Sequence, residues 1–358
     1  MNVLNLGMIP HMLVMNVIMS KALILVVGRL MQFWAIAYIF LPAERLIPFH
    51  PKQRLFRAYL GLDLLHYFVG GIFIIVFVQA TYLLMPLLAG WLGIHGSPLS
   101  VRHLPGWMQF LVFEAGWTFL GYWLHRLEHV WAPLWRMHSI HESVKEIDWL
   151  SAFRLHPLEP VLFQVLTIMP LWLFEMSIPA ATAYSIYSYI TAHVQHANIV
   201  FPIGPLKYVF PTPEFHRWHH ARVYDSNGLE TQTLSNFGQY PIWDLLFGTF
   251  YLPKDRPVAY GSAEGDKVPT DYLAQLVYPF GWHETVLAWE RRFWQRFQWQ
   301  ARFVKMHDAL RPVHEGVDNW LARLCLLRQP DGVRVAQADT GTSINPGEGL
   351  HVKPDTAI

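Results

Sequence analysis

The sequence predicts an all-α membrane protein with about four spanning helices and a histidine-rich helical domain on one side of the bilayer. Hydrophobic residues make up 53% of the 358 positions and charged residues only 15%, against about 25% charged in soluble domains. The sixteen Trp, fifteen Tyr and twenty-three Phe fit the aromatic enrichment found at membrane interfaces. Nine histidines gather in four clusters between His125 and His220.

The first 43 residues are predicted to be an N-terminal membrane segment. Residues 1–20 contain no charged side chain, and Lys21 ends this run. A signal peptide carries basic residues before its apolar core, so a membrane-embedded or interfacial segment is favoured. Residues 22–42 predict the first spanning helix. Arg29 interrupts it, which is costly unless this residue lies near an end or has a partner.

Residues 44–260 are predicted to form the main domain, beginning with two further crossings. Residues 44–57 are a basic, proline-broken connection, which the positive-inside rule assigns to the cytoplasm. Residues 64–100 contain no Asp, Glu, Lys or Arg and predict one spanning helix, followed by a loop near 90–98. Residues 104–122 predict the span that returns the chain to the cytoplasmic side.

The histidine clusters are predicted to lie on that same cytoplasmic side. Residues 125–156 are polar, basic and rich in histidine. Two apolar runs follow, 161–174 and 176–196, and predict a helical hairpin that enters the membrane and returns. Residues 201–212 form a Pro- and Gly-containing loop before the last cluster. All four clusters therefore end on one face of the membrane, which a shared site requires.

The C-terminal part is more polar. Residues 261–328 predict a cytosolic or interfacial helical region. Within it, aromatic residues and arginines alternate over 289–303, which predicts either a helix lying on lipid headgroups or a helix that docks a partner. Residues 329–358 are rich in Gly, Pro, Asp and Thr and are predicted to be disordered.

Each histidine cluster has the spacing of one helix face. The motifs are HRLEH (125–129), HSIHE (138–142), HVQH (193–196) and HRWHH (216–220). Residues three or four apart are neighbours on a helix, so each motif can direct its imidazoles to one point. The candidate metal ligands are His125, His129, His138, His141, Glu142, His193, His196, His216, His219 and His220.

The donor types indicate which metal could bind. The chain has one cysteine, Cys325, which excludes an internal disulfide framework, a Cys-ligated zinc site and a Cys-ligated iron–sulfur cluster. Nine histidines and one carboxylate are too many for one ion but suit two. Nitrogen-rich sites without thiolate fit iron used with O2. The net charge of +1 gives no indication of nucleic acid as a partner.

Other interpretations of the clusters remain open on these grounds. Paired histidines could hold haem in a membrane electron carrier, or the chain could transport metal. His156 has no partner at helical spacing and precedes Pro157. It could be a ligand, a residue that supports a ligand, or part of a lid.

From about Glu44 to about Tyr260 the sequence resembles the fatty acid hydroxylase / sterol desaturase superfamily of membrane di-iron oxygenases. Besides the four clusters, the resemblance rests on ERLIPFHPKQ, DWLSAFRLHPLEP (148–160) and PIWDLLFGTFYLP (241–253). It implies a helical membrane domain with a cytosolic histidine-rich cap, two iron ions, O2 as co-substrate and an external electron-transfer protein. It also implies hydroxylation or desaturation of a lipid such as a sterol, a fatty acyl or sphingoid chain, or an alkylglycerol.

One position departs from the family pattern. The second motif of the family usually reads HxxHH, whereas this chain has Glu142 in the last place. The carboxylate could ligate iron, favour another metal, or mark a degenerate member that only binds lipid. The chain contains no HPGG-type haem-binding segment, so a separate donor is expected. Basic residues that could attract an acidic donor, or instead face lipid phosphates or neighbouring acids, are Arg126, Arg136, Lys145, Arg217 and Arg222.

Overall fold

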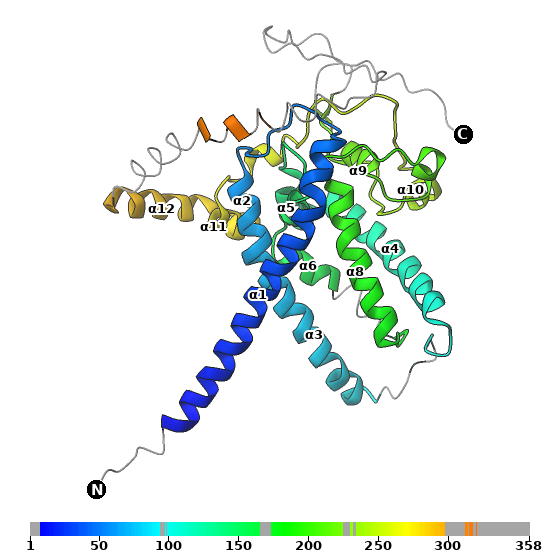
Figure 1. The fold of residues 1–358 in the computed structure, drawn as a ribbon, viewed down its shortest axis with the longest axis vertical. Coiled ribbons are helices and arrows are strands. Elements are labelled where there is room, and N and C mark those ends of the chain that lie inside the picture. Colours follow the sequence, from blue (N-terminus) through cyan, green and yellow to red (C-terminus); the bar gives the residue numbers. More distant parts are fainter. Residues whose placement is uncertain are drawn as a thin grey trace.

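The computed structural model of the chain is helical, as expected (Figure 1). It describes residues 8–93, 97, 99–164, 173–224, 230–231, 234–297, 312–313, 315–317 and 320. The α-helices are α1 (Met8–Leu46), α2 (Leu60–Leu65), α3 (Gly71–Trp91), α4 (Gly106–Val130), α5 (Ala132–Glu142), α6 (Leu158–Phe163), α8 (Ile178–His196), α9 (Pro213–His219), α10 (Pro241–Phe247), α11 (Tyr272–Val277) and α12 (His283–Phe297).

Shorter elements connect these helices. They are the π-helical turn η1 (His66–Gly70) and the 3-10 turns η2 (Ser151–Phe153), η4 (Gly204–Tyr208), η5 (Gly265–Lys267) and η6 (Tyr278–Phe280). The prediction of an all-α fold omitted one feature, a short antiparallel pair of strands. In this pair β1 (Val223–Tyr224) faces β2 (Glu230–Thr231).

Two helical stretches within the described part of the chain are long and apolar enough to cross a membrane, judged by length and composition. The first, Leu23–Leu46, lies in α1 and contains most of the predicted span 22–42. The second, Leu60–Trp91, runs continuously through α2, η1 and α3. Both carry many exposed apolar side chains, and such a surface is unfavourable in water. Among the exposed residues are Leu23, Ile24, Met31, Trp34, Tyr38, Phe73, Leu83, Leu84, Leu87 and Trp91.

The other predicted membrane regions are occupied by α4 and α8, and neither of these two helices qualifies as a span by length and composition. Most of the first run of the predicted hairpin, residues 165–172, lies outside the described residues. The predicted disordered tail, 329–358, also lies outside them.

Arg29 has the partner that a cation in an apolar helix requires. Its side chain is only 4% exposed, and it donates two hydrogen bonds, of 3.0 and 2.7 Å, to the carbonyl oxygen of Tyr67. The guanidinium also lies 3.7 Å from the centre of the Tyr67 ring. A side chain at Gly71 would collide with this guanidinium, so the glycine allows α1 and α3 to approach. These contacts join the two apolar helices.

A buried network of charges joins the start of α2 to the loop after α5. Arg57 pairs with Asp63 and with Asp148, the latter at 2.6 Å from Nε to Oδ2. Arg154 donates from Nε to the other Asp63 oxygen at 2.5 Å. All four side chains are buried. Two cations and two anions therefore balance among buried side chains.

We expect Asp63→Asn to destabilise the protein by about 3–5 kcal/mol, because it leaves buried arginines without their countercharge. The measurement is the thermal unfolding midpoint of purified protein in detergent. Asp266→Asn is the control, because Asp266 is 39% exposed and pairs with Lys145 and Arg222 near the surface. Losing the negative charge of Asp266 should lower the free energy of unfolding by at most about 1 kcal/mol. If both variants lowered the unfolding midpoint equally, the buried charge network would not have the stabilising role assigned to it.

The helices that carry the histidine motifs meet at one end of the bundle. In Figure 1, α4 and α8 run side by side toward α5 and α9. Trp131, in an extended conformation, reverses the chain between α4 and α5, and Pro133 occupies the first turn of α5. Thr212 caps α9 by accepting a hydrogen bond from the Phe215 amide at 3.2 Å. Such caps begin a short helix at a defined residue.

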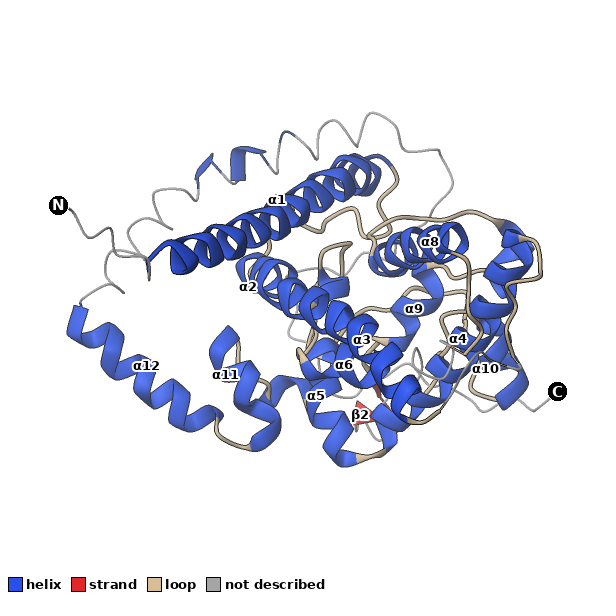
Figure 2. Cartoon of the chain, turned by 90° about the horizontal axis from the view of Figure 1, so that it is seen from below, coloured by secondary structure: helices blue, strands red, loops and turns tan. Residues whose placement is uncertain are grey.

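The C-terminal helices lie apart from this meeting point. Figures 1 and 2 both place α11 and α12 on the side of the molecule away from α10. Helix α12 begins at His283 and covers the first part of the predicted amphipathic stretch. Both helices fall in the region 261–328, which was predicted to be helical.

Candidate metal centre

The described residues contain three groups of possible metal ligands, of which the third, Glu128, His138 and Glu159, shares His138 with the first. The first group forms where α4, α5 and α9 meet. The helix reversal at Trp131 turns the end of α5 back against the last turns of α4. The first group consists of His125, His129, His138, Glu142 and His219, whose ligand atoms all lie within 4.8 Å of one another. The Nε2 atoms of His125 and His138 are 3.0 Å apart.

The second group lies beside the first and draws on α5, α8 and α9. It consists of His141, His196, His216 and His220, again with ligand atoms within 4.8 Å of one another. Nε2 of His196 is 3.1 Å from Nε2 of His141 and 3.0 Å from Nε2 of His216. Nε2 of His220 is 3.0 Å from Nε2 of His216. All four residues are buried.

Backbone carbonyls orient four of these imidazoles. In each case Nδ1 lies 2.7 to 3.3 Å from a carbonyl oxygen. Since a carbonyl can only accept, Nδ1 carries the hydrogen and, in the neutral ring, Nε2 presents its lone pair to the group. The pairs are His125 with Phe237, His141 with Arg154, His196 with Ala192, and His219 with Ser235.

The carboxylate of Glu142 joins the two groups. Its Oε1 lies 3.3 Å from Nε2 of His138 and 3.2 Å from Nε2 of His219, both in the first group. Its Oε2 lies 3.0 Å from Nδ1 of His220, whose Nε2 belongs to the second group. Burial raises the pKa of Glu142, but His220 and His219 outweigh it and hold this pKa well below the usual range. The carboxyl is therefore an anion between the groups.

Burial favours the neutral form of two histidines in the last cluster, His216 and His220. Burial, followed by the neighbouring His196, lowers the pKa of His216 well below its usual value. Burial also lowers the pKa of His220, and Glu142 offsets only part of that change. Metal ions bind the deprotonated imidazole. The site thus keeps these donors in the form that coordinates a metal.

The donor geometry fits metal ions. Two ligands at right angles on an ion with bonds of about 2.1 Å lie about 3.0 Å apart, close to the 3.0 and 3.1 Å between Nε2 atoms of the second group. His129 gives separate support, since neither of its buried ring nitrogens has a hydrogen-bond partner among the described residues. Burying ring nitrogens without a hydrogen-bond partner is costly unless a metal ion binds one of them.

His193 is the candidate that the structure does not bring into either group. It lies one turn before His196 on α8, and its Nδ1 donates to the carbonyl oxygen of Trp149 at 2.8 Å. Its ring packs against Phe153 and Tyr189, with centroids 4.9 and 4.8 Å away. His156 also lies outside the groups, with its Nε2 3.0 Å from the Leu276 carbonyl oxygen.

The spacing of the histidine motifs gave no indication of the residues that hold the neighbouring loop in place. Asn236 has a left-handed φ of 58°, and its side chain bonds to the backbone of Phe215 and Tyr251 at 2.7 to 3.0 Å. Asp244 accepts from the Phe237 amide at 2.9 Å. These bonds hold the loop whose carbonyls orient His125 and His219. Asp244 falls in the stretch 241–253, which carried the family resemblance, whereas nothing in the sequence pointed to Asn236.

Glu128 and Glu159 were also missed. Both are buried, and both face Nδ1 of His138. Glu159 falls in the stretch 148–160 of the resemblance, but its spacing from the histidines gave no reason to select it.

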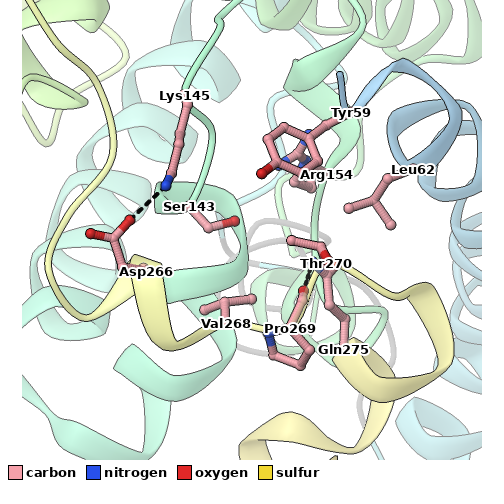
Figure 3. Close-up of a pocket in the computed structure, with 11 residues that line it drawn as sticks. Tyr59, Leu62, Ser143, Lys145, Arg154, Asp266, Val268, Pro269, Thr270 and Gln275 are labelled. Carbon is pink, nitrogen blue, oxygen red and sulfur yellow. Dashed lines mark hydrogen bonds and ion pairs between the residues drawn. The ribbon is translucent and has the colours of Figure 1, made fainter. Parts of the chain in front are cut away.

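Figure 3 shows a small pocket near the end of α5. Its volume is about 40 Å³, room for a few water molecules and too little for a lipid chain. None of the candidate ligands lines it, and the Lys145–Asp266 ion pair of 2.8 Å closes one side. This pocket is therefore not the place where a lipid would react.

Comparison with known proteins agrees with the geometry. The model of the family "Fatty acid hydroxylase" matches residues 110–249, a range that contains every candidate ligand. This part of the chain is similar to the fatty acid hydroxylase / sterol desaturase superfamily. Within this superfamily it is similar to ornithine lipid hydroxylase OlsE of Rhizobium tropici, with 33% identity over 160 residues, 44% of this chain and 46% of that protein.

The names of two further relatives refer to other lipids. The alkylglycerol monooxygenase of Xenopus tropicalis is 29% identical over 200 residues, 52% of this chain and 38% of that protein. The very-long-chain aldehyde decarbonylase GL1-6 of Oryza sativa subsp. indica is 32% identical over 161 residues, 40% and 23% respectively. The chain thus spans less than half the length of these relatives. No solved structure gives a significant match.

Proposed function

We propose that this protein is a membrane-bound oxygenase that uses two iron ions, O2 and external electrons to hydroxylate a lipid chain. The observation that carries the proposal is the pair of adjoining histidine groups, joined by one carboxylate. Desaturation is the other outcome that the same site supports, because it begins with the same removal of a hydrogen atom. The names of the relatives favour hydroxylation, since two of the three quoted are a hydroxylase and a monooxygenase.

The chain's own residues have distinct roles in this proposal. His125, His129, His138, His219 and Oε1 of Glu142 would hold one ion, and His141, His196, His216 and His220 would hold the other. Such ions supply reductive activation of O2, which yields an oxidant for an unactivated C–H bond. The carbonyls that accept from Nδ1 keep the imidazoles aimed inward, and this preorganisation supports a metal site. Burial of the donors excludes bulk water from the reacting atoms.

The membrane supplies the substrate in this proposal. The helices that would enter the bilayer are the two apolar stretches, Leu23–Leu46 and Leu60–Trp91, together with α4 and α8. The predicted run 161–174, most of which lies outside the described residues, would bring the chain across to the start of α8. Support for α4 and α8 comes from their exposed apolar side chains, which include Trp107, Leu111, Phe119, Trp123, Ile178, Ile186 and Ile190. The histidine-bearing ends of α4 and α8 then lie at the membrane surface, where a lipid chain can enter from the bilayer.

The metal centre would face the cytoplasm. The connection 44–57 and the segment 125–156 are both rich in basic residues, and such loops remain on the cytoplasmic side. A separate reductase or other electron-transfer protein would dock there. We propose lipids of the kinds named in the relatives, ornithine lipids and alkylglycerols, as the first substrates to examine.

The geometry gives less support to a haem carrier. The two axial histidines of one haem bind opposite faces of the porphyrin, and the plane between them must be open to the width of the ring. Here four Nε2 atoms lie together, with successive separations of 3.0 to 3.1 Å. A transporter is also less well supported, because its ligands would be distributed along the spans. In this chain the donors gather at one end of α4 and α8.

Lipid profiling tests the proposal. Cells expressing the wild-type chain should contain a lipid that has gained one oxygen atom, and the atom should come from isotopically labelled O2. Cells expressing His219→Ala at the same level should lack this product, because that variant loses a ligand of the first group. Purified wild-type protein should contain two irons and no Soret band. An unchanged lipid profile together with metal-free protein would refute the proposal.

A further inference from the structure

His138 differs from the histidines that backbone carbonyls orient. Its Nδ1 faces two carboxyl groups, with Oε1 of Glu159 at 3.0 Å and Oε2 of Glu128 at 3.7 Å. Its Nε2 is turned the other way, 3.0 Å from Nε2 of His125 and 3.3 Å from Oε1 of Glu142. One nitrogen thus belongs to the first ligand group, and the other lies against acids outside it.

The two acids come from separate elements and are fixed in place. Glu159 lies in the first turn of α6, and its amide donates to the carbonyl oxygen of His156 at 2.9 Å. Glu128 lies on α4 between the ligands His125 and His129. Glu159 is 3% exposed and Glu128 is 1% exposed. Two acids buried this deeply are costly unless they act on a partner, and the partner that both share is Nδ1 of His138.

We propose that Glu159 is a positioning residue for His138: its carboxylate accepts the Nδ1 hydrogen and thereby directs Nε2 to the metal ion of the first group. This inference rests on the proposed function, because it presumes that a metal binds there. Glu128 contributes a second carboxyl at the longer distance, beyond hydrogen-bond reach. Helix α6 thus takes part in the site although it carries no ligand.

Electrostatics gives the physical reason for a carboxylate at this position. A hydrogen bond to an ionised acceptor is roughly twice as strong as one to a neutral carbonyl. It also draws the Nδ1 proton away from the ring, which increases the electron density that Nε2 offers to a metal. The first group would therefore contain one imidazole that is a stronger donor than its neighbours, and the two metal positions would be unequal.

The variants Glu159→Gln and Glu159→Ala test this inference, with Glu114→Gln as the matched control. Glu114 is a buried acid on α4 whose side chain contacts Gln239 at 3.4 Å and Tyr240, neither of which is a candidate ligand. Each purified protein is titrated with Fe²⁺ and Co²⁺ against a chelator. We expect Glu159→Ala to bind one of the two ions about 10- to 100-fold more weakly. The other ion should keep its wild-type affinity.

Glu159→Gln separates positioning from a structural role. An amide oxygen can still accept the Nδ1 hydrogen but carries no charge, so this variant should lose less affinity than Glu159→Ala. The Co²⁺ absorption bands of the affected ion should shift in both variants, while the unfolding midpoint of the metal-free protein stays the same for Glu159→Gln. A residue that only fills space would lower the midpoint in Glu159→Ala and leave the Co²⁺ bands unchanged in both variants.

Three outcomes would overturn the inference. The first is unchanged affinity for both ions in Glu159→Ala, and the second is an equal effect of Glu114→Gln. The third is a third ion in the wild-type protein that Glu159→Ala loses, because Glu128, His138 and Glu159 would then be ligands themselves. Failure of the proposed function differs from all three, since the wild-type protein would then bind no metal.

Discussion

Replacing His196 with glutamine will remove metal from the second group, whereas the same replacement at His193 will leave both ions bound. The two residues lie one turn apart on α8 and are equally well buried. Only His196 has its Nε2 among the other donors, 3.1 Å from that of His141 and 3.0 Å from that of His216. His193 instead packs among aromatic rings. Loss of one imidazole in four should weaken binding of that ion at least 100-fold, about 3 kcal/mol.

The measurement is iron content per chain after equilibration with a chelator, together with the yield of oxidised lipid. In His196→Gln one ion should be lost and the oxidised lipid should fall below detection. In His193→Gln a modest loss of thermal stability is expected, because glutamine replaces an aromatic partner while still able to donate to the Trp149 carbonyl. Loss of metal from His193→Gln, or its full retention in His196→Gln, would show that the ligand groups are assigned wrongly.

Removing the carboxylate of Glu142 will affect both ions at once. This side chain contributes Oε1 to the first group and places Oε2 3.0 Å from Nδ1 of His220 in the second. Glu142→Ala therefore removes a ligand from one ion and the orienting acceptor of a ligand from the other. We expect the affinity for the first ion to fall about 100-fold or more and that for the second about 10-fold or more.

Two milder variants separate the effect of Glu142 on the first ion from its effect on the second. Glu142→Gln keeps one oxygen in position but supplies no negative charge, so both affinities should fall, each by less than in Glu142→Ala. Glu142→His restores the pattern usual in the superfamily and offers a nitrogen donor to the first ion, but it leaves Nδ1 of His220 without its anion. Its second ion should be as weak as in Glu142→Ala. If only one of the two affinities changes in Glu142→Ala, the carboxylate does not join the groups.

The histidine motifs could be interpreted from the sequence because helix geometry is local. Positions three and four apart lie on one face whatever the rest of the chain does, so HRWHH predicts three inward imidazoles, and the structure places all three in the ligand groups. The apolar stretch 64–100 was likewise identified from composition, and the structure has the helical run Leu60–Trp91 over most of it. A departure such as Glu142 was visible too, since it stands within a motif.

Residues whose roles depend on long-range contacts could not be found in this way. HVQH has the same spacing as a ligand pair, yet only His196 lies with the other ligands, because the angle at which α8 meets α5 and α9 decides which face is inward. Glu159 is separated from His138 by 21 positions, and Asn236 acts through the backbone of Phe215. The repeat of a helix or strand relates only residues close in sequence, so it cannot relate such pairs.

The sequence by itself determined that the chain is helical, apolar enough for a membrane and equipped with nitrogen donors grouped by turns of helix. Only the tertiary structure decided how those donors divide into two groups and that Glu142 stands between them. It also decided that acids from α4 and α6 support His138. The physical reason is that side-chain periodicity is set within a helix, whereas the meeting of donors from α4, α5, α8 and α9 depends on how those helices pack.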